Sequence, residues 1–205
     1  MSASLFGVET PGLCQLPGLA AAEEPALLAQ IGAIAAMAPF RVMLTPGGGR
    51  LSAAMTNCGQ AGWVSDRRGY RYERTDPLTG RPWPALPCLF QSLARRAAHE
   101  AGFPGFTPDV CLINRYEPGA KMALHQDRDE ADFTAPIVSV SLGLAVMFLW
   151  GGAGRADKPR KLLLGSGDVV VWGGPARLNF HGVAPLKPGP HPLGLRYNLT
   201  FRRAL

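Results

Sequence analysis

From residue 110 onward, Gly and Pro divide the sequence into short segments that carry β-branched or aromatic residues. The 205-residue chain contains 25 Gly and 19 Pro, and turn formers at this frequency favour short strands over long helices. One apolar pair of segments turns at Gly143 and predicts two neighbouring core strands. We therefore expect a mainly β fold, a sandwich or a barrel. The predicted strands span 110–116, 121–127, 137–143, 144–150, 168–174, 177–183 and 195–203.

Two helices are predicted before and between these strands. The segment AEEPALLAQIGAIAAMAP has Glu23 and Glu24 at its start, and Pro39 ends it. A second helix is predicted at Leu89–Ala101, because helix formers fill this stretch and Gly102 closes it. We expect both helices to flank the β core from outside.

The composition excludes several classes of protein. Hydrophobic residues make up 47% of the chain, which is typical of one globular domain and too high for a disordered protein. The apolar stretch Pro25 to Phe40 is too short to span a bilayer, and MSASLFGVET lacks the basic start of a secretory signal. None of the four cysteines forms a C-x-x-C pair. We therefore expect a monomer in the cytoplasm, with free thiols and no membrane attachment.

Basic charge is concentrated in one segment. The formal net charge is +6, and residues 41–81 hold seven Arg against three acidic residues, so +4 of the total lies there. Such a segment is typical of a surface that binds phosphates and stacks bases, and a solvated irregular loop is the alternative. Basic and aromatic residues alternate within it: Trp63, Arg67, Arg68, Tyr70, Arg71, Tyr72 and Arg74.

The tripeptide His125-Gln126-Asp127 is the first chemical motif. Residues i and i+2 of a strand share a face, so this imidazole and carboxylate can bind one metal ion together. His181 is the candidate third ligand, because the alternation in RLNFHGV places it with polar neighbours. Two His and one carboxylate with open positions is the arrangement of non-haem Fe(II) oxygenases. A structural hydrogen-bonded pair is the alternative.

The last predicted strand has two different faces. Leu195, Tyr197, Leu199 and Phe201 lie on one face, and Arg196, Asn198, Thr200 and Arg202 lie on the other. The polar face fits a wet sheet edge. It also fits the interior of a small barrel, where the two arginines need carboxylates and a bound dicarboxylate supplies them. Asn114 and Tyr116 share a strand face and offer an amide and a phenol to the same ligand.

Taken together, these motifs resemble one family. The sequence is similar to the AlkB family, Fe(II)- and 2-oxoglutarate-dependent dioxygenases that repair alkylated bases, and is close to its bacterial founding member. The similarity runs from about Pro39 to Arg203, and residues 55–72 resemble the nucleotide-recognition lid of the family. The other matching segments are NRYEPGAKMALHQDRDE (114–130), SVSLG (139–143), GDVVVWGG (167–174), RLNFHGV (177–183) and RYNLTFR (196–202).

The resemblance implies a double-stranded β-helix, or jelly-roll, core at 85–205. It also implies a lid at 41–84 and a helical extension at 1–40, all within one structural domain. The implied cofactor is Fe(II), with 2-oxoglutarate and O2 as cosubstrates. The implied iron ligands are His125, Asp127 and His181, and the implied 2-oxoglutarate contacts are Asn114, Tyr116, Arg196, Asn198 and Arg202.

The resemblance also implies a set of substrate contacts. Asp129 matches the acid that faces the damaged base, and with the iron ligands it is counted as catalytic. Arg128 and Lys161 each stand where the other basic residue is expected, and lysine lacks the two-pronged geometry of arginine. Loop 151–160 is the least similar part. The implied substrate-binding residues are Met55, Trp63, Tyr70, Arg128, Asp129, Glu130 and Lys161.

The reaction implied by the family is oxidative demethylation. Decarboxylation of 2-oxoglutarate to succinate and CO2 is coupled to release of formaldehyde from bases such as 1-methyladenine and 3-methylcytosine. The expected partner is alkylated single-stranded DNA, with double-stranded DNA and RNA as further candidates. Two alternatives stay open: a 2-oxoglutarate-dependent hydroxylase or demethylase of RNA, protein or a small molecule, and a binding module with a structural metal.

Overall fold

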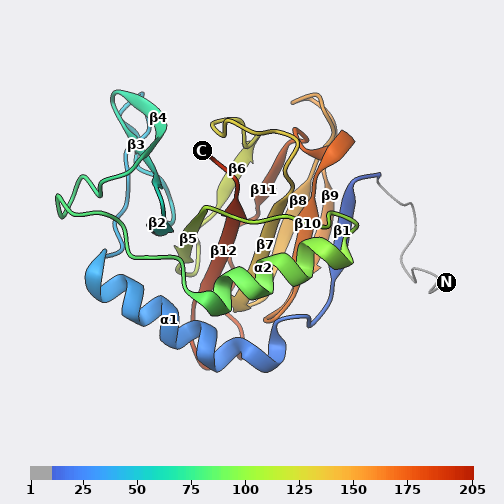
Figure 1. Cartoon of the computed structure of the whole chain (residues 1–205). Coiled ribbons are helices and arrows are strands. Elements are labelled where there is room, and N and C mark those ends of the chain that lie inside the picture. The colour runs from blue at the N-terminus through green and yellow to red at the C-terminus, as the bar shows by residue number, and fades with distance from the viewer. Residues whose placement is uncertain (1–10) are drawn as a thin grey trace.

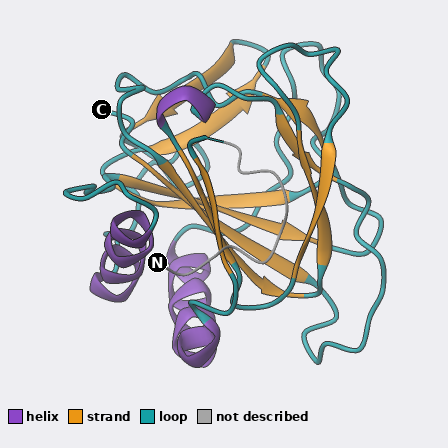
Figure 2. Ribbon diagram, turned by 90° about the vertical axis from the view of Figure 1, so that its right-hand side faces the viewer, coloured by secondary structure: helices purple, strands orange, loops and turns teal. Residues whose placement is uncertain are grey.

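The computed structural model describes residues 11–205 and contains two antiparallel sheets (Figures 1 and 2). The larger sheet has, in order, β1 (Leu13–Leu16), β10 (Val169–Trp172), β7 (Ile137–Gly143), β12 (Arg196–Arg202), β5 (Val110–Tyr116) and β2 (Ala54–Gly59). The smaller sheet has β6 (Met122–His125), β11 (His181–Val183), β8 (Val146–Trp150) and β9 (Arg160–Leu164). A separate hairpin contains β3 (Gly62–Asp66) and β4 (Gly69–Glu73). This arrangement confirms the mainly β fold with a jelly-roll core.

Both predicted helices are present and lie on the outer side of the larger sheet (Figures 1 and 2). Helix α1 (Glu24–Met37) follows a short 3-10 helix, Ala21–Glu23, and has Pro25 in its first turn. Helix α2 (Cys88–Glu100) ends before Gly102, whose φ of 86° is the left-handed conformation that closes helices. Neither these helices nor any other helix within residues 11–205 is long and apolar enough to cross a bilayer.

Strand β12 is a central strand, so the wet-edge alternative is wrong. It pairs with β5 on one side and with β7 on the other. Leu199 and Phe201 are buried against the helices, where Phe201 meets Phe90 edge to face with centroids 5.8 Å apart. The intervening polar residues therefore face the space between the two sheets. The alternation in the sequence thus places two arginines inside the molecule.

The chain passes from the larger sheet to the smaller one at Gly143. The predicted turn is confirmed there: φ is +89°, and a Cβ would clash with the carbonyl oxygen of Leu195. The sequence predicts that the strands on either side, β7 and β8, are neighbours. This is wrong, because the two strands belong to different sheets.

Five strands were not predicted from the sequence: β1, β2, β3, β4 and β9. Strand β2 is buried on both faces, so it lacks the alternation that reveals a strand. It pairs with β5 inside the larger sheet, although it lies within the predicted lid, and β1 pairs with β10 although it lies within the predicted extension. Residues 1–10 of that extension lie outside the described residues, and the boundaries at 40 and 84 stay predictions.

The predicted strand at 177–183 is wrong in its first half. A 3-10 helix at Gly174–Ala176 and the turn after it replace the extended backbone, and β11 contains only His181–Val183. Gly174 has φ +54° and Pro175 follows it, which turns the chain before the strand begins. His181 is therefore the first residue of its strand.

We expect Phe201→Ala to destabilise the fold by about 3 to 5 kcal/mol, because Phe201 is fully buried between β12 and the helices. Urea unfolding followed by circular dichroism measures the change. Leu163→Ala is the control: this β9 side chain is 63% exposed, so the change should stay within about 0.5 kcal/mol. Equal losses in the two variants would contradict this assignment of the core.

Candidate active site

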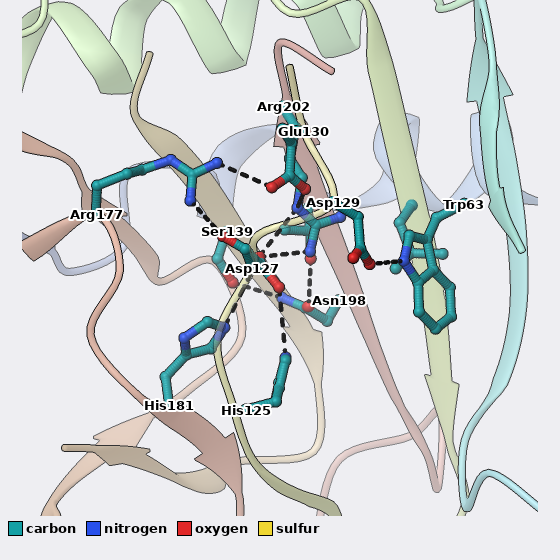
Figure 3. Close-up of polar contacts among 12 residues, drawn as sticks. Trp63, His125, Asp127, Asp129, Glu130, Ser139, Arg177, His181, Asn198 and Arg202 are labelled. Atoms are coloured by element: carbon teal, nitrogen blue, oxygen red, sulfur yellow. Dashed lines mark hydrogen bonds and ion pairs between the residues drawn. The ribbon is translucent and has the colours of Figure 1, made fainter. Parts of the chain in front are cut away.

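The structure brings His125, Asp127 and His181 together between the sheets (Figure 3). His125 ends β6, His181 begins β11, and the two are directly paired across the smaller sheet. His125 Nε2 lies 3.5 Å from Asp127 Oδ1, and His181 Nε2 lies 3.8 Å from Asp127 Oδ2. One ligand atom from each residue lies within 4.8 Å of the others. This spacing allows all three to bind one ion.

The backbone orients both imidazoles. His125 Nδ1 lies 2.9 Å from the carbonyl oxygen of Ala123, and His181 Nδ1 lies 3.1 Å from that of Asn179. A ring whose Nδ1–H donates to a carbonyl presents its Nε2 lone pair to the centre. The two Nε2 atoms are thus held ready as ligands.

Electrostatics favour the metal-binding protonation states of His181 and Asp127. Burial, with the nearby His125 ring, lowers the pKa of His181 to about 3, so this imidazole is neutral. Burial lowers the pKa of His125 too, but the hydrogen bond and charge of Asp127 outweigh it and raise that pKa. Burial alone raises the pKa of Asp127, yet the charge of Arg202 and the His125 contact hold it well below its ordinary value. An ionised carboxylate beside imidazoles is a donor set that suits a divalent cation.

Buried polar atoms next to this cluster have no partner within the described residues. They are Asn114 Oδ1, Arg196 Nε and Nη1, and Arg202 Nη1. The Arg196 side chain is almost completely buried, its guanidinium lies over the Tyr116 ring at 5.2 Å, and only its Nη2 donates, to Ser141 Oγ at 3.0 Å. Since unpaired buried donors cost free energy, two arginines in this state fit the carboxylates of a bound 2-oxoglutarate.

Asn198 forms part of the polar wall beside these arginines (Figure 3). Its Nδ2 donates to Ser139 Oγ at 2.8 Å and to the carbonyl oxygen of Val140 at 3.0 Å. Thr200 Oγ1 donates to Asn198 Oδ1 at 2.9 Å. The inner face of β12 is therefore held rigid between its neighbours.

A cavity of about 730 Å³ opens over the metal-binding cluster, and most of the predicted site residues line it. Arg196 does not itself line the cavity, but its guanidinium lies over the ring of Tyr116, which does. Lys161 does not reach the cavity: it is exposed on β9, paired with Leu149. The predicted residues at the wall are Met55, Trp63, Tyr70, Asn114, Tyr116, His125, Asp127, Arg128, Asp129, Glu130, His181, Asn198 and Arg202.

The hairpin β3–β4 supplies an aromatic wall to this cavity. The rings of Trp63 and Tyr70 stack at 5.5 Å with an interplanar angle of 14°. Trp63 Nε1 donates to Asp129 Oδ2 at 2.8 Å, so a carboxylate lies at the edge of the indole (Figure 3). A flat cationic ring can stack on the indole and contact this carboxylate.

Several charged residues at or near the cavity were not predicted from the sequence. Arg50, Lys121 and Arg155 add positive charge to the cavity wall, and Arg155 also lies over the Phe180 ring at 5.6 Å. Their positions in loops and turns gave no signal beyond charge. Arg177 was placed on a strand face, yet it is buried in a turn and donates to the carbonyl oxygen of Asp127 at 2.7 Å. The burial of an arginine in a turn cannot be predicted from the periodicity of neighbouring residues.

We expect His125→Ala and Asp127→Asn to weaken Mn(II) binding on the order of 100-fold or more, because each removes one of three ligands. Isothermal titration calorimetry measures the affinity, and thermal unfolding checks that each variant is folded. His99→Ala, at an exposed position of α2, is the matched control. Unchanged Mn(II) affinity in both ligand variants would sink the metal assignment.

Comparisons with known proteins agree with this geometry. The model of the 2OG-Fe(II) oxygenase superfamily matches residues 12–202. The alpha-ketoglutarate-dependent dioxygenase AlkB of Salmonella typhimurium is 56% identical over 196 residues, 95% of this chain and 91% of that protein. AlkB of Escherichia coli is 58% identical over 180 residues, 87% of this chain and 83% of that protein. The solved structure of OsALKBH1 has a TM-score of 0.85 at 30% identity, covering 96% of this chain and 99% of that one. The chain therefore belongs to the AlkB family of 2OG-Fe(II) oxygenases.

Proposed function

We propose that this protein removes N-methyl groups oxidatively from cationic bases, 1-methyladenine and 3-methylcytosine, in single-stranded DNA. One observation carries the proposal: the indole of Trp63 and the carboxylate of Asp129 meet at the wall of the cavity that contains the metal-binding cluster. Both lesions are flat and positively charged, so an aromatic face and a carboxylate together favour them over normal bases.

Family membership makes the chain an Fe(II)- and 2-oxoglutarate-dependent dioxygenase, which sets aside the binding module with a structural metal. Bound Fe(II) with 2-oxoglutarate and O2 supplies the oxidation of the methyl group, with succinate and CO2 as coproducts. His125, Asp127 and His181 hold the iron in this proposal. Their carboxylate stays ionised and His181 stays neutral, so no proton has to leave either before the ion binds.

The 2-oxoglutarate contacts are proposed from the polar atoms that lack partners. Arg202, at the cavity wall beside Asp127, is assigned to one end of the dicarboxylate. The unpaired Nε and Nη1 of Arg196 are assigned to the other end, at the part of the wall that Tyr116 forms. Asn114 lines the same cavity and can donate its amide N–H to a carboxylate, while Asn198 keeps the inner face of β12 in position. Burial then excludes water from the cosubstrate.

The substrate side follows from charge and shape. Trp63 stacks on the flipped base, Asp129 stabilises its positive charge, and Met55 and Tyr70 complete the wall. Methylation blocks the pairing edge, so such a base costs less to flip out than a normal one. Oxidation of the methyl group gives an N-hydroxymethyl base, which loses formaldehyde and regenerates the unmodified base.

Fewer arginines of residues 41–81 are available for phosphate contacts than the charge count suggests. Arg68 and Arg71 form ion pairs with Asp66 and Glu73 within the hairpin, and Arg41 pairs with the buried Asp76. We therefore assign the phosphate contacts to basic residues at the cavity wall. These are Arg50, Lys121, Arg128 and Arg155, with Lys161 at the outer face of β9 as a more distant contact.

A monomer acting in the cytoplasm, as the sequence predicts, fits the free thiols of Cys14, Cys58, Cys88 and Cys111.

The test is a lesion panel of methylated and etheno bases in single-stranded DNA, double-stranded DNA and RNA. With Fe(II), 2-oxoglutarate and O2, we expect each methylated lesion to release formaldehyde and to lose about 14 Da, one methylene, with the greatest turnover for cationic bases in single-stranded DNA. An etheno lesion instead loses its two-carbon bridge as glyoxal. The Asp127→Asn variant is the inactive control. Absence of formaldehyde from every methylated nucleic acid in iron-replete conditions would refute the proposal, and turnover of a protein or small molecule instead would favour the alternative dioxygenase.

The Asp129→Asn variant tests the role of the carboxylate. It keeps an oxygen that can accept the Trp63 hydrogen bond but removes the negative charge. We expect kcat/KM to fall roughly 10- to 100-fold for 1-methyladenine, since a charged hydrogen bond is lost, and to change much less for the neutral 1,N6-ethenoadenine. Equal losses on the cationic and neutral lesions would show that charge is not what Asp129 contributes.

A further inference from the structure

Glu130, a predicted substrate contact, lines the cavity, and three other side chains already contact its carboxylate (Figure 3). Its side chain is only 2% exposed. Oε1 accepts a hydrogen bond from Tyr72 Oη at 2.8 Å and lies 3.2 Å from Arg202 Nε. Oε2 accepts from Arg177 Nη2 at 3.1 Å. A carboxylate with these partners is placed to hold other residues rather than a base.

The three partners come from different parts of the fold. Tyr72 lies on β4 of the nucleotide-recognition hairpin, Arg202 lies on β12, and Arg177 lies in the turn before β11. Arg177 also donates to the carbonyl oxygens of Asp127 and Ala135, which anchors it in the core. Glu130 thus joins the hairpin to the two-sheet core through one buried group.

The contact to Arg202 reaches the cosubstrate end of the site. Arg202 donates from Nε and Nη2 to Asp127 Oδ2 at 3.0 and 2.6 Å, while its Nη1 has no partner among the described residues. Glu130 Oε1, 3.2 Å from Nε, adds a second carboxylate at this edge of the guanidinium and helps Asp127 to hold its plane, and therefore the direction of Nη1. Tyr72 lies on the hairpin and donates to the same Glu130 oxygen that lies beside Arg202 Nε, so a displaced hairpin would alter the contact at Arg202.

We propose that Tyr72, Glu130 and Arg202 form a relay that couples nucleic-acid binding at the hairpin to 2-oxoglutarate binding at β12, with Glu130 as a positioning residue and not a substrate contact. This inference rests on the proposed function. A nucleic acid that holds the hairpin against the core keeps the phenol on Glu130, which keeps Arg202 aimed at the cosubstrate. By linkage, 2-oxoglutarate strengthens nucleic-acid binding by the same factor.

The experiment measures binding without turnover. Mn(II) replaces Fe(II), and the Kd of 2-oxoglutarate is measured by calorimetry with and without a saturating single-stranded oligonucleotide that carries 1-methyladenine. For the wild-type chain we expect the oligonucleotide to lower this Kd by about 5- to 10-fold, the lower end of typical coupling. Fluorescence anisotropy measures oligonucleotide binding separately.

Two variants dissect the relay. Tyr72→Phe keeps the ring and removes the donor to Glu130, so the coupling should shrink to about twofold or less. Glu130→Gln weakens 2-oxoglutarate binding even without the oligonucleotide, because Arg202 loses a charged partner. Because Tyr72 and Glu130 act in one relay, the oligonucleotide should change the Kd of 2-oxoglutarate by the same factor in the double variant as in Glu130→Gln alone.

The control is Tyr197→Phe, which removes a phenol on the helix-facing side of β12, next to Phe40. It should keep full coupling. Thermal unfolding shows whether each variant is folded, and a purely structural role for Glu130 would lower the unfolding temperature without changing the ratio of the two Kd values.

Independent binding in the wild type, or full coupling in Tyr72→Phe, would overturn the relay while leaving the proposed function intact. Failure of the wild type to bind any methylated oligonucleotide would instead overturn both.

Discussion

Asp127 is an ionised carboxylate in a buried site, and the rest of the active centre depends on its staying ionised. Burial alone favours the neutral acid, but Arg202 and the two histidines outweigh that cost and hold the pKa well below its ordinary value. The same carboxylate faces both imidazole Nε2 atoms. Its backbone carbonyl accepts from Arg177, so the loop after β6 is fixed at two points. A neutral residue at this position would leave Arg202 buried with one fewer partner.

The two-sheet fold explains how such a cluster can exist inside a small domain. Each strand of the larger sheet has one face for the helices and one face for the space between the sheets. Strand β12 uses the first face for Leu199 and Phe201 and the second for its arginines. Apolar packing on one side therefore stabilises the chain, while the other side holds Arg202, whose charge is balanced by Asp127 and Glu130.

Local patterns in the sequence predicted those strands and helices whose formation depends on neighbouring residues. Turn-bounded alternation revealed β5 and β12, and helix formers ending at Gly102 revealed α2. Strand β2 was missed because both of its faces are buried. The predicted strand before His181 failed because Gly174 and Pro175 turn the backbone.

Residues whose surroundings depend on tertiary structure could not be placed from local sequence patterns. Arg155 and Lys161 carry the same charge and lie six residues apart in the sequence. Only the fold shows that Arg155 reaches the cavity while Lys161 is exposed on β9. The family resemblance implies that Glu130 contacts substrate, and no local pattern in the sequence indicates which residues surround it. Its burial among Tyr72, Arg177 and Arg202 depends on segments that are far apart in the chain.

The central claim is that one cavity couples consumption of 2-oxoglutarate to removal of a methyl group from a stacked cationic base. The most direct measurement is the ratio of succinate to formaldehyde, followed over time with single-stranded DNA that carries 1-methyladenine. The account predicts a ratio close to one, with both products lost in Asp127→Asn. Succinate formed at the same rate with and without methylated DNA, and no formaldehyde, would contradict it.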